Sequence, residues 1–295
     1  MKTIDIIGVQ MDLGASRRGV NMGPMAIRYG GLCEGLEQLG FAVNDLGDIA
    51  PLVTGATAPY MRNYEQVIEL NRRLYQMVAA ALEQDHFPVV LGGDHSIAAG
   101  SISAAARHYR NIGVIWIDAH GDWNNEESTP SGNMHGMPFS AVCGHGPDCM
   151  VDFGGPPALV DVRRCVQIGG RDIDDRERLR MKRAGVTVFP INTIDKLGMQ
   201  AVIGQAIDIA GTGTEGIHLS FDIDAIDPQA APGTGTVVHS GLTVREAFLA
   251  VESLADSGKL VSMDMVEVNP ILDERNKTAI LASQLIQSAL GKAVY

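Results

Sequence analysis

Short apolar, β-branched segments alternate with amphipathic segments along nearly the whole chain, and this alternation constrains the fold more than any other feature. Several of the strand-like segments are apolar throughout, as expected of parallel strands that are covered on both faces. The predicted strands are residues 4–9, 89–91, 112–117, 165–168, 186–189, 216–221 and 260–265. The predicted helices are residues 64–83, 97–109, 174–184, 244–255 and 277–290. The alternation predicts an α/β fold, a three-layer sandwich with a central parallel sheet flanked by helices.

No repeat, linker or low-complexity tract interrupts this pattern, so we expect residues 1–295 to form a single domain. The formal net charge is −12, from 23 basic and 35 acidic residues. An acidic surface repels phosphate backbones, so nucleic acid is not an expected partner. No segment approaches the roughly 18 apolar residues of a membrane span, and the N-terminus lacks the pattern of a signal peptide. We therefore expect a cytoplasmic protein without a membrane partner.

The four cysteines do not suggest a disulfide framework. Four in 295 residues is typical of a protein in a reducing compartment. Cys143, His145 and Cys149 lie close in sequence, but their spacing matches no familiar zinc pattern. We interpret them as ordinary loop residues.

Polar residues follow three of the predicted strands. A Gly-Gly-Asp turn follows residue 91 and leads to His95; the other two clusters are Asp118, His120 and Asp122, and Asp222 and Asp224. In open α/β sheets, ligands bind beyond the carboxyl ends of the strands. A lone aspartate there usually caps a turn, and a lone histidine is usually structural. The coincidence of all three clusters at strand ends favours a metal site.

The alternate positions of Asp118, His120 and Asp122 would point all three side chains to one side of an extended chain. Together the three clusters supply four carboxylates and two imidazoles. Four carboxylates in one pocket repel each other, and two divalent cations would neutralise their charge. The absence of thiolate ligands favours manganese over zinc.

The motifs that carry these residues closely resemble the arginase branch of the ureohydrolase family over nearly the whole chain. They comprise residues 8–14, 17–24, 92–96, 118–122, 131–136, 220–228 and 267–270. The resemblance implies an eight-stranded parallel sheet and two Mn²⁺ ions. One ion would be held by His95, Asp118, Asp122 and Asp222, and the other by His120, Asp118, Asp222 and Asp224. The implied reaction is the hydrolysis of L-arginine to L-ornithine and urea by a hydroxide that bridges the two ions.

The resemblance also implies catalytic roles for three residues. Asp122 would pass a proton to the departing amine, His135 would exchange protons with solvent, and Glu267 would pair with the guanidinium. Thr236 matches a family position close to that glutamate. Without the resemblance, His135 in its glycine-rich loop would be interpreted as a surface residue. Glu267 is flanked by two valines in a strand-like segment, so its charge would still have to be paired or functional.

Substrate choice depends on groups at the far end of the site. By resemblance, Asn124, Ser131 and Asn133 would donate to the α-carboxylate of arginine. Asp172, Asp174 and Glu177 would meet its α-ammonium. The alternative is that residues 171–177 are simply the acidic start of a helix.

Several alternatives remain open from the sequence. The chain could hydrolyse another guanidino compound, such as agmatine or guanidinobutyrate, or it could be a metal-poor homologue without enzymatic activity. A dinuclear phosphatase is disfavoured because no basic group stands near the motifs. The sequence departs from animal arginases at Asp175-Arg176 and at His239-Ser240. It resembles bacterial arginases more closely, which implies a homo-oligomer, either a hexamer or a trimer.

Overall fold

An eight-stranded sheet forms the centre of the molecule in the computed structural model, which describes residues 2–52, 61–153 and 156–293. The strand order is β2-β1-β3-β8-β7-β4-β5-β6, and every neighbouring pair is parallel. The strands are β1 (Thr3–Val9), β2 (Ala42–Ile49), β3 (Phe87–Leu91), β4 (Ile112–Ile117), β5 (Cys165–Ile168), β6 (Thr187–Phe189), β7 (Gly216–Asp222) and β8 (Leu260–Val266).

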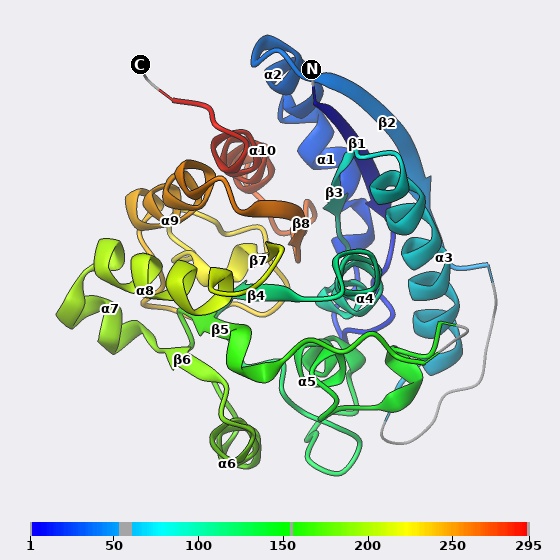
Figure 1. The fold of residues 1–295 in the computed structure, drawn as a ribbon, viewed down its shortest axis with the longest axis vertical. Helices are drawn as coiled ribbons and strands as arrows, with labels where there is room; N and C mark the ends of the chain where they lie inside the picture. Colours follow the sequence, from blue (N-terminus) through cyan, green and yellow to red (C-terminus); the bar gives the residue numbers. More distant parts are fainter. Residues whose placement is uncertain (1, 53–60, 154–155, 294–295) are drawn as a thin grey trace.

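Helices cover both faces of this sheet, as Figure 1 shows. One face carries α1 (Gly23–Tyr29), α2 (Leu32–Gln38), α7 (Ile191–Leu197), α8 (Met199–Gly211), α9 (Val244–Ser257) and α10 (Lys277–Ala289). The other carries α3 (Tyr64–Glu83), α4 (Ala98–Tyr109), α5 (Pro138–Val142) and α6 (Asp175–Ala184). No helix in the described ranges is long and apolar enough to cross a membrane. The predicted three-layer α/β sandwich is confirmed.

Side chains of each central strand alternate between two cores. In β4, Ile115 and Ile117 pack under α8 and α9, while Val114 and Trp116 pack under α3 and α4. Every residue of β3, β4 and β7 is buried. This two-sided burial explains why these strands have continuous apolar sequences instead of alternating ones.

The seven predicted strands are all present, with ends that differ by at most two residues. The sequence did not predict β2, which lies at the edge of the sheet and is largely exposed. Its residues pair with β1 without burying an apolar face, so no hydrophobic pattern marks them. Helices α1, α2, α5, α7 and α8 were also not predicted. The first four are short, and α8 contains two glycines.

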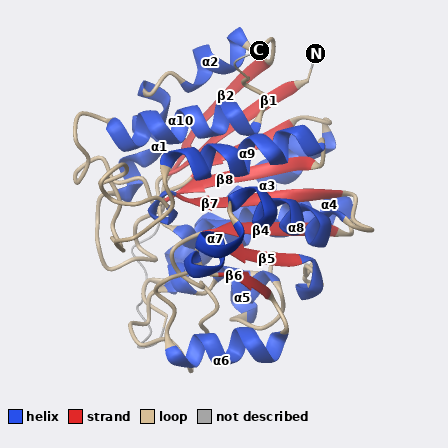
Figure 2. Cartoon of the chain, turned by 90° about the vertical axis from the view of Figure 1, so that its left-hand side faces the viewer, coloured by secondary structure: helices blue, strands red, loops and turns tan. Residues whose placement is uncertain are grey.

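Four adjacent strands at the centre of the sheet, β3, β8, β7 and β4, end at the same edge. The loops that follow them gather there, at the left in Figure 2. His95, Asp118, Asp222 and Glu267 all lie within four residues of these strand ends. The parallel arrangement therefore brings together residues that are up to 172 positions apart in sequence.

Candidate metal centre

His95 begins a short 3-10 turn, η2 (His95–Ile97), after β3. Gly93 is required in the preceding turn because a Cβ there would lie 1.8 Å from the carbonyl oxygen of Met11. The Asp94 carboxylate then caps the turn by accepting the backbone N–H of Ser96 at 3.1 Å. These constraints leave the His95 ring fully buried beneath the ends of β4 and β7.

Asp118, His120 and Asp122 follow β4 in an irregular segment. The Asp118 carboxylate accepts the indole N–H of Trp116 at 2.9 Å and the backbone N–H of His120 at 2.7 Å. Asp122 has a φ of +47°, in the left-handed region that non-glycine residues seldom occupy. The predicted mechanism of convergence, alternation along an extended strand, is therefore wrong. The three side chains gather because the chain turns.

Asp222 and Asp224 follow from the end of β7. Asp222 is the last residue of the strand, and its carboxylate accepts the backbone N–H of Asp224 at 2.8 Å. Asp224 lies in the next turn, η6 (Ile223–Ala225). Its Oδ1 accepts the backbone N–H of Ala119 at 3.2 Å, which ties the loop after β7 to the loop after β4.

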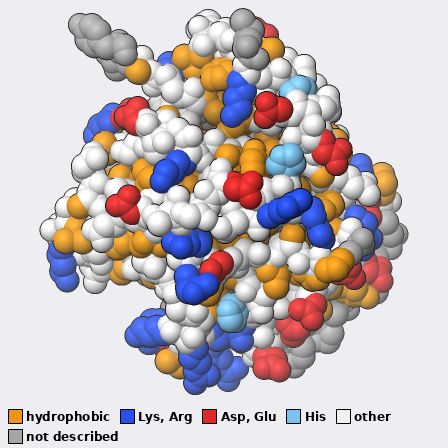
Figure 3. All heavy atoms as spheres, viewed as in Figure 1, with side chains coloured by type: hydrophobic (Ala, Val, Ile, Leu, Met, Phe, Trp, Pro, Cys, Tyr) orange, Lys and Arg blue, Asp and Glu red, His pale blue; other side chains and the backbone are white. Residues whose placement is uncertain are grey.

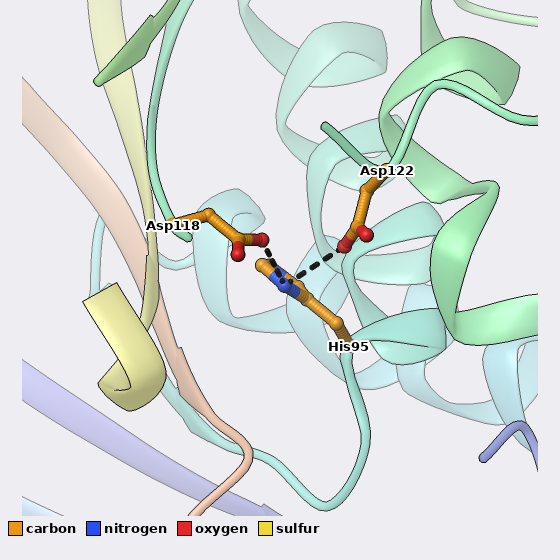
Figure 4. Close-up of side chains that lie close together, drawn as sticks. All are labelled: His95, Asp118 and Asp122. Atoms are coloured by element: carbon orange, nitrogen blue, oxygen red, sulfur yellow. Dashed lines mark ion pairs between the residues drawn. The ribbon is translucent and has the colours of Figure 1, made fainter. Parts of the chain in front are cut away.

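Three carboxylate oxygens surround Nδ1 of His95. This nitrogen lies 3.1 Å from Asp118 Oδ2 and 3.1 Å from Asp122 Oδ2 (Figure 4). It also lies 3.3 Å from Asp222 Oδ2. It makes no well-oriented hydrogen bond to any described residue, although it is buried. One ring nitrogen cannot serve three carboxylates with a single N–H. Ligand atoms that converge in this way fit a shared cation.

A second group lies beside the first. His120 Nδ1 is 3.3 Å from Asp118 Oδ1 and 3.1 Å from Asp224 Oδ2. Within the part of the chain that the structure describes, two groups could thus hold a metal ion. They are His95 with Asp118 and Asp122, and His120 with Asp118 and Asp224. Asp118 belongs to both, with one carboxylate oxygen facing each histidine. The all-oxygen-and-nitrogen ligand set suits divalent cations of the manganese type.

The charges of this cluster perturb each other strongly. Burial and the neighbouring carboxylates Asp224 and Asp118 raise the pKa of Asp222 well above its ordinary value. Burial and the charge of Asp118 raise the pKa of Asp122 to about 6. Burial alone would lower the pKa of His95, but its three carboxylate neighbours raise it well above 6.5. Without cations, the cluster thus retains protons that metal binding would have to displace.

Behind this cluster, Glu267 connects two histidines. Its Oε1 accepts the backbone N–H of His95 at 2.9 Å and lies 2.9 Å from Nδ1 of His135. The sequence placed Glu267 within a strand, whereas β8 ends at Val266 and Glu267 has a φ of +64°. His135 lies in η3 (Met134–Gly136), and only 17% of its side chain is exposed, so it is not the surface residue that the sequence alone indicated.

A cavity of roughly 230 Å³ opens above the cluster. Every predicted substrate-contacting residue except Glu267 lines it, and Glu267 contacts the lining residue His135. The lining residues are His120, Asp122, Asn124, Thr129, Pro130, Ser131, Asn133, His135, Gly136, Asp172, Asp174, Glu177, Asp222 and Thr236. Acidic and amide side chains that belong to neither metal-binding group thus form one wall of this cavity.

The start of α6 contributes the acidic part of this wall. Asp174 is the N-cap residue, and its Oδ2 accepts the side-chain N–H of Asn124 at 3.2 Å. Glu177 accepts the backbone N–H groups of Trp123 at 2.7 Å and of Asp174 at 3.3 Å. Burial raises the pKa of Glu177 to about 8. These residues therefore form the acidic helix start that was the alternative interpretation, and they also face the cavity. Basic side chains gather over the rest of α6 (Figure 3).

Other predicted residues have clear local roles. Thr236 donates its hydroxyl to Asp224 Oδ2 at 2.9 Å, so its contact is with a candidate ligand. Cys143 lies 3.5 Å from Cys165, and Cys149 lies 4.0 Å from the sulfur of Met61. His145 packs near Trp123. These contacts agree with the interpretation of the Cys143, His145 and Cys149 cluster as loop residues.

Comparison with known proteins gives the same assignment as the motifs. The family model described as the arginase family matches residues 2–291. The chain belongs to the arginase family. It is 46% identical to an arginase of Bacillus subtilis over 99% of this chain and 98% of that protein.

Solved arginase structures have the same fold. The native arginase of Bacillus caldovelox superposes with a TM-score of 0.96 at 45% identity, over 100% of both chains. The arginase of Bacillus cereus superposes with a TM-score of 0.94 at 46% identity, also over 100% of both chains. The eight-stranded sheet expected from the resemblance is confirmed. Membership of the arginase family implies a dinuclear metal centre, and the two histidine–aspartate groups fit one.

Proposed function

We propose that this protein hydrolyses L-arginine to L-ornithine and urea. The observation that carries the proposal is the pair of metal-binding groups that share Asp118, beside a cavity that acidic and amide side chains also line. A guanidinium is a poor electrophile because its charge is delocalised, so its hydrolysis needs a strong nucleophile at neutral pH. The same lining offers anions and neutral donors for the other charged groups of arginine.

We propose two Mn²⁺ ions as the resident metals. His95, Asp118, Asp122 and Asp222 would hold one, and His120, Asp118, Asp222 and Asp224 the other. The bound metals would lower the pKa of a water so that it can act as a nucleophile. The proximity of Asp222 Oδ2 to His95 Nδ1 supports its place in the first set. Its place in the second set rests on the family resemblance.

The residues of the chain would control the protons of the reaction. Asp122 lines the cavity beside His95 and would carry a proton from the attacking water to the departing amine. His135 also lines the cavity, and Glu267 holds its Nδ1, which leaves Nε2 to exchange protons with solvent. Glu267 Oε2 has no hydrogen bond within the described residues and would meet the guanidinium.

The acidic and amide side chains of this wall would bind the amino acid end of the substrate. Asn124, Ser131 and Asn133 would donate to the α-carboxylate, and Asp172, Asp174 and Glu177 would attract the α-ammonium. Asp172 and Asp174 are exposed at the cavity rim, so a cation can approach them without displacing an existing ion pair within the described residues. This wall favours arginine over agmatine and guanidinobutyrate, each of which lacks one of the two charged groups.

Urea release from arginine, agmatine and guanidinobutyrate, measured after loading with manganese, tests the proposal. We expect the highest kcat/KM with arginine. A preference for agmatine or guanidinobutyrate would keep the chemistry and overturn the substrate assignment. A chain that binds no manganese and releases no urea would instead be a homologue without enzymatic activity.

We further propose that residues 1–295 act as one domain in a cytoplasmic homo-oligomer, either a hexamer or a trimer. The four cysteines are all free thiols, which suits a reducing compartment. Exposed apolar side chains on α1, before it and after β8 support self-association; they are Met22, Met25, Tyr29 and Ile271. Sedimentation equilibrium of the manganese-loaded protein would test this, and a monomer at micromolar concentration would contradict it.

A further inference from the structure

The side chain of Arg171 lies under the loops that follow β5 and β7. It is partly buried, and it makes no ion pair with any described carboxylate. All its hydrogen bonds go to backbone carbonyls. Nε donates to the carbonyl oxygen of His239 at 3.1 Å. Nη1 donates to those of Gly169 at 3.5 Å and Ala225 at 3.1 Å. Nη2 donates to those of Asp224 at 2.7 Å and Val238 at 2.8 Å. A guanidinium has five N–H donors, so this set of acceptors uses all of them.

The backbone of Arg171 makes hydrogen bonds to a different loop, the one that follows β4. The N–H groups of Arg171 and Asp172 both donate to the carbonyl oxygen of Ala119, at 2.8 Å and 3.0 Å. Ala119 lies between Asp118 and His120, and its own N–H donates to Asp224 Oδ1 at 3.2 Å. The backbone of Arg171 therefore anchors the loop after β4, while its side chain anchors the loop after β7.

These two loops carry the second metal-binding group. His120 comes from the loop after β4 and Asp224 from the loop after β7, and their ligand atoms lie 3.1 Å apart. The first group is held in another way. The backbone N–H of His95 donates to Glu267, and Nε2 of its ring lies 2.8 Å from the hydroxyl of Ser220. Arg171 has no hydrogen bond to His95, Ser220 or Glu267 within the described ranges.

We propose that Arg171 is a positioning residue that fixes the spacing of the His120, Asp118 and Asp224 group and so sets the affinity of one of the two metal sites. The inference rests on the metal centre of the proposed function. Arg171 would influence the geometry of the His120 group and leave that of the His95 group unchanged. Arg171 does not line the cavity, and within the described residues its side chain makes no hydrogen bond to a ligand side chain.

The charge of Arg171 would act in the opposite direction. Its guanidinium stands near the aspartates of the cluster and, by Coulomb repulsion, disfavours further cations there. If charge dominated, removing it would strengthen manganese binding. If geometry dominates, removing it weakens binding, because the loop after β7 loses its anchor. The sign of the change therefore distinguishes the two effects.

Manganese titrations in two single-site backgrounds test the proposal. With His95→Asn, only the His120 group remains complete, and with His120→Asn, only the His95 group does. Arg171→Met should weaken binding about 10-fold to 100-fold in the first background, as supporting residues around metal ligands do. It should change binding little in the second. Arg171→Lys should resemble Arg171→Met, because a single ammonium cannot reproduce the planar fork.

The matched control is Arg178→Met, which should leave both affinities unchanged. Among the described residues, the ion pair of Arg178 is with exposed Asp175. Unchanged or tighter binding to the His120 group in Arg171→Met would overturn the proposal. So would an equal loss at both groups, wild-type affinity in Arg171→Lys, or a His95→Asn parent that binds no manganese. If Arg171→Met does not fold, as judged from its melting temperature without metal, Arg171→Lys alone decides. A wild-type chain that binds no manganese would overturn the metal centre itself.

Discussion

His135 and Glu267 form a partly buried pair, with Nδ1 of the histidine 2.9 Å from Oε1 of the glutamate. Burial alone would lower the pKa of His135, but the hydrogen bond and the charge of Glu267, with Asp122 and Asp94 nearby, raise it to about 9. The histidine is therefore protonated at neutral pH in the protein without metal. The pair also reaches the metal cluster, because the same oxygen accepts the backbone N–H of His95.

Removing the charge of Glu267 should lower the pKa of His135 towards 6.5. In Glu267→Gln without metal, the largest cause that raises this pKa is lost, while burial still lowers it. The pKa can be followed by the ring proton resonances of His135 during a pH titration. A His135 pKa that stays near 9 in the variant would contradict the assigned pairing.

Replacing His135 should slow turnover without loss of metal. In His135→Asn, proton exchange with solvent would be impaired, and general acid–base groups typically contribute about 100-fold to 10,000-fold. The loss in kcat should shrink when imidazole is added to the buffer. Steady-state kinetics with parallel metal analysis provide the measurement. Wild-type turnover across the pH range would exclude a shuttle at this position.

Asp174 tests the identity of the substrate. Asp174→Asn removes a charge-assisted contact to the α-ammonium, worth about 1.5–3 kcal/mol. For arginine this corresponds to roughly 10-fold to 150-fold in kcat/KM, mostly through KM. Guanidinobutyrate lacks the α-ammonium and should lose little. The kinetics of the variant on both compounds, with metal content verified, provide the test.

Asp175→Asn is the matched control for this change. Asp175 is the next residue of the same helix start, but it does not line the cavity. A role limited to the helix start would give small stability effects, about 0.3–1 kcal/mol, and would affect both substrates alike. Equal proportional losses on arginine and guanidinobutyrate in Asp174→Asn would thus defeat the substrate contact.

Glu177 should make the stability of the fold depend on pH. Its pKa is about 8 in the folded protein against 4.5 for an unperturbed glutamate, because burial disfavours its charge. The folded state therefore binds a proton that the unfolded state releases between about pH 4.5 and 8. The resulting stabilisation is full below that window and is lost as the pH rises through it. Melting temperatures of the metal-free protein should fall more steeply over this window in the wild type than in Glu177→Gln. Parallel curves would contradict the assignment.

The sequence predicted the layers of the fold and the clustering of the candidate ligands for a physical reason. Buried parallel strands require continuous apolar segments, and polar residues at their carboxyl ends stand out against them. The edge strand β2 carries no such signal, since its pairing with β1 uses backbone groups that every residue has. The role of Arg171 could not be predicted for the same reason, because all the acceptors of its side chain are backbone carbonyl oxygens.

The backbone conformation of the site residues could not be predicted from sequence patterns. Asp122 and Glu267 both adopt the left-handed region, which few non-glycine residues occupy. Neither conformation could be inferred from alternation, because both residues are held by long-range contacts, with His95 and with His135. The importance of Asp94 was also missed. Its buried carboxylate accepts the backbone N–H of Gly14, and the carbonyl of Gly14 accepts the N–H of His135.

The proposed reaction depends on two metal ions, and one titration tests that dependence directly. Metal-stripped protein is supplied with increasing manganese, and urea release from L-arginine is measured beside the bound metal in the same samples. We expect no urea from the stripped protein and a rate that rises until two equivalents are bound per chain. Full activity in protein that verifiably contains no metal would contradict the account.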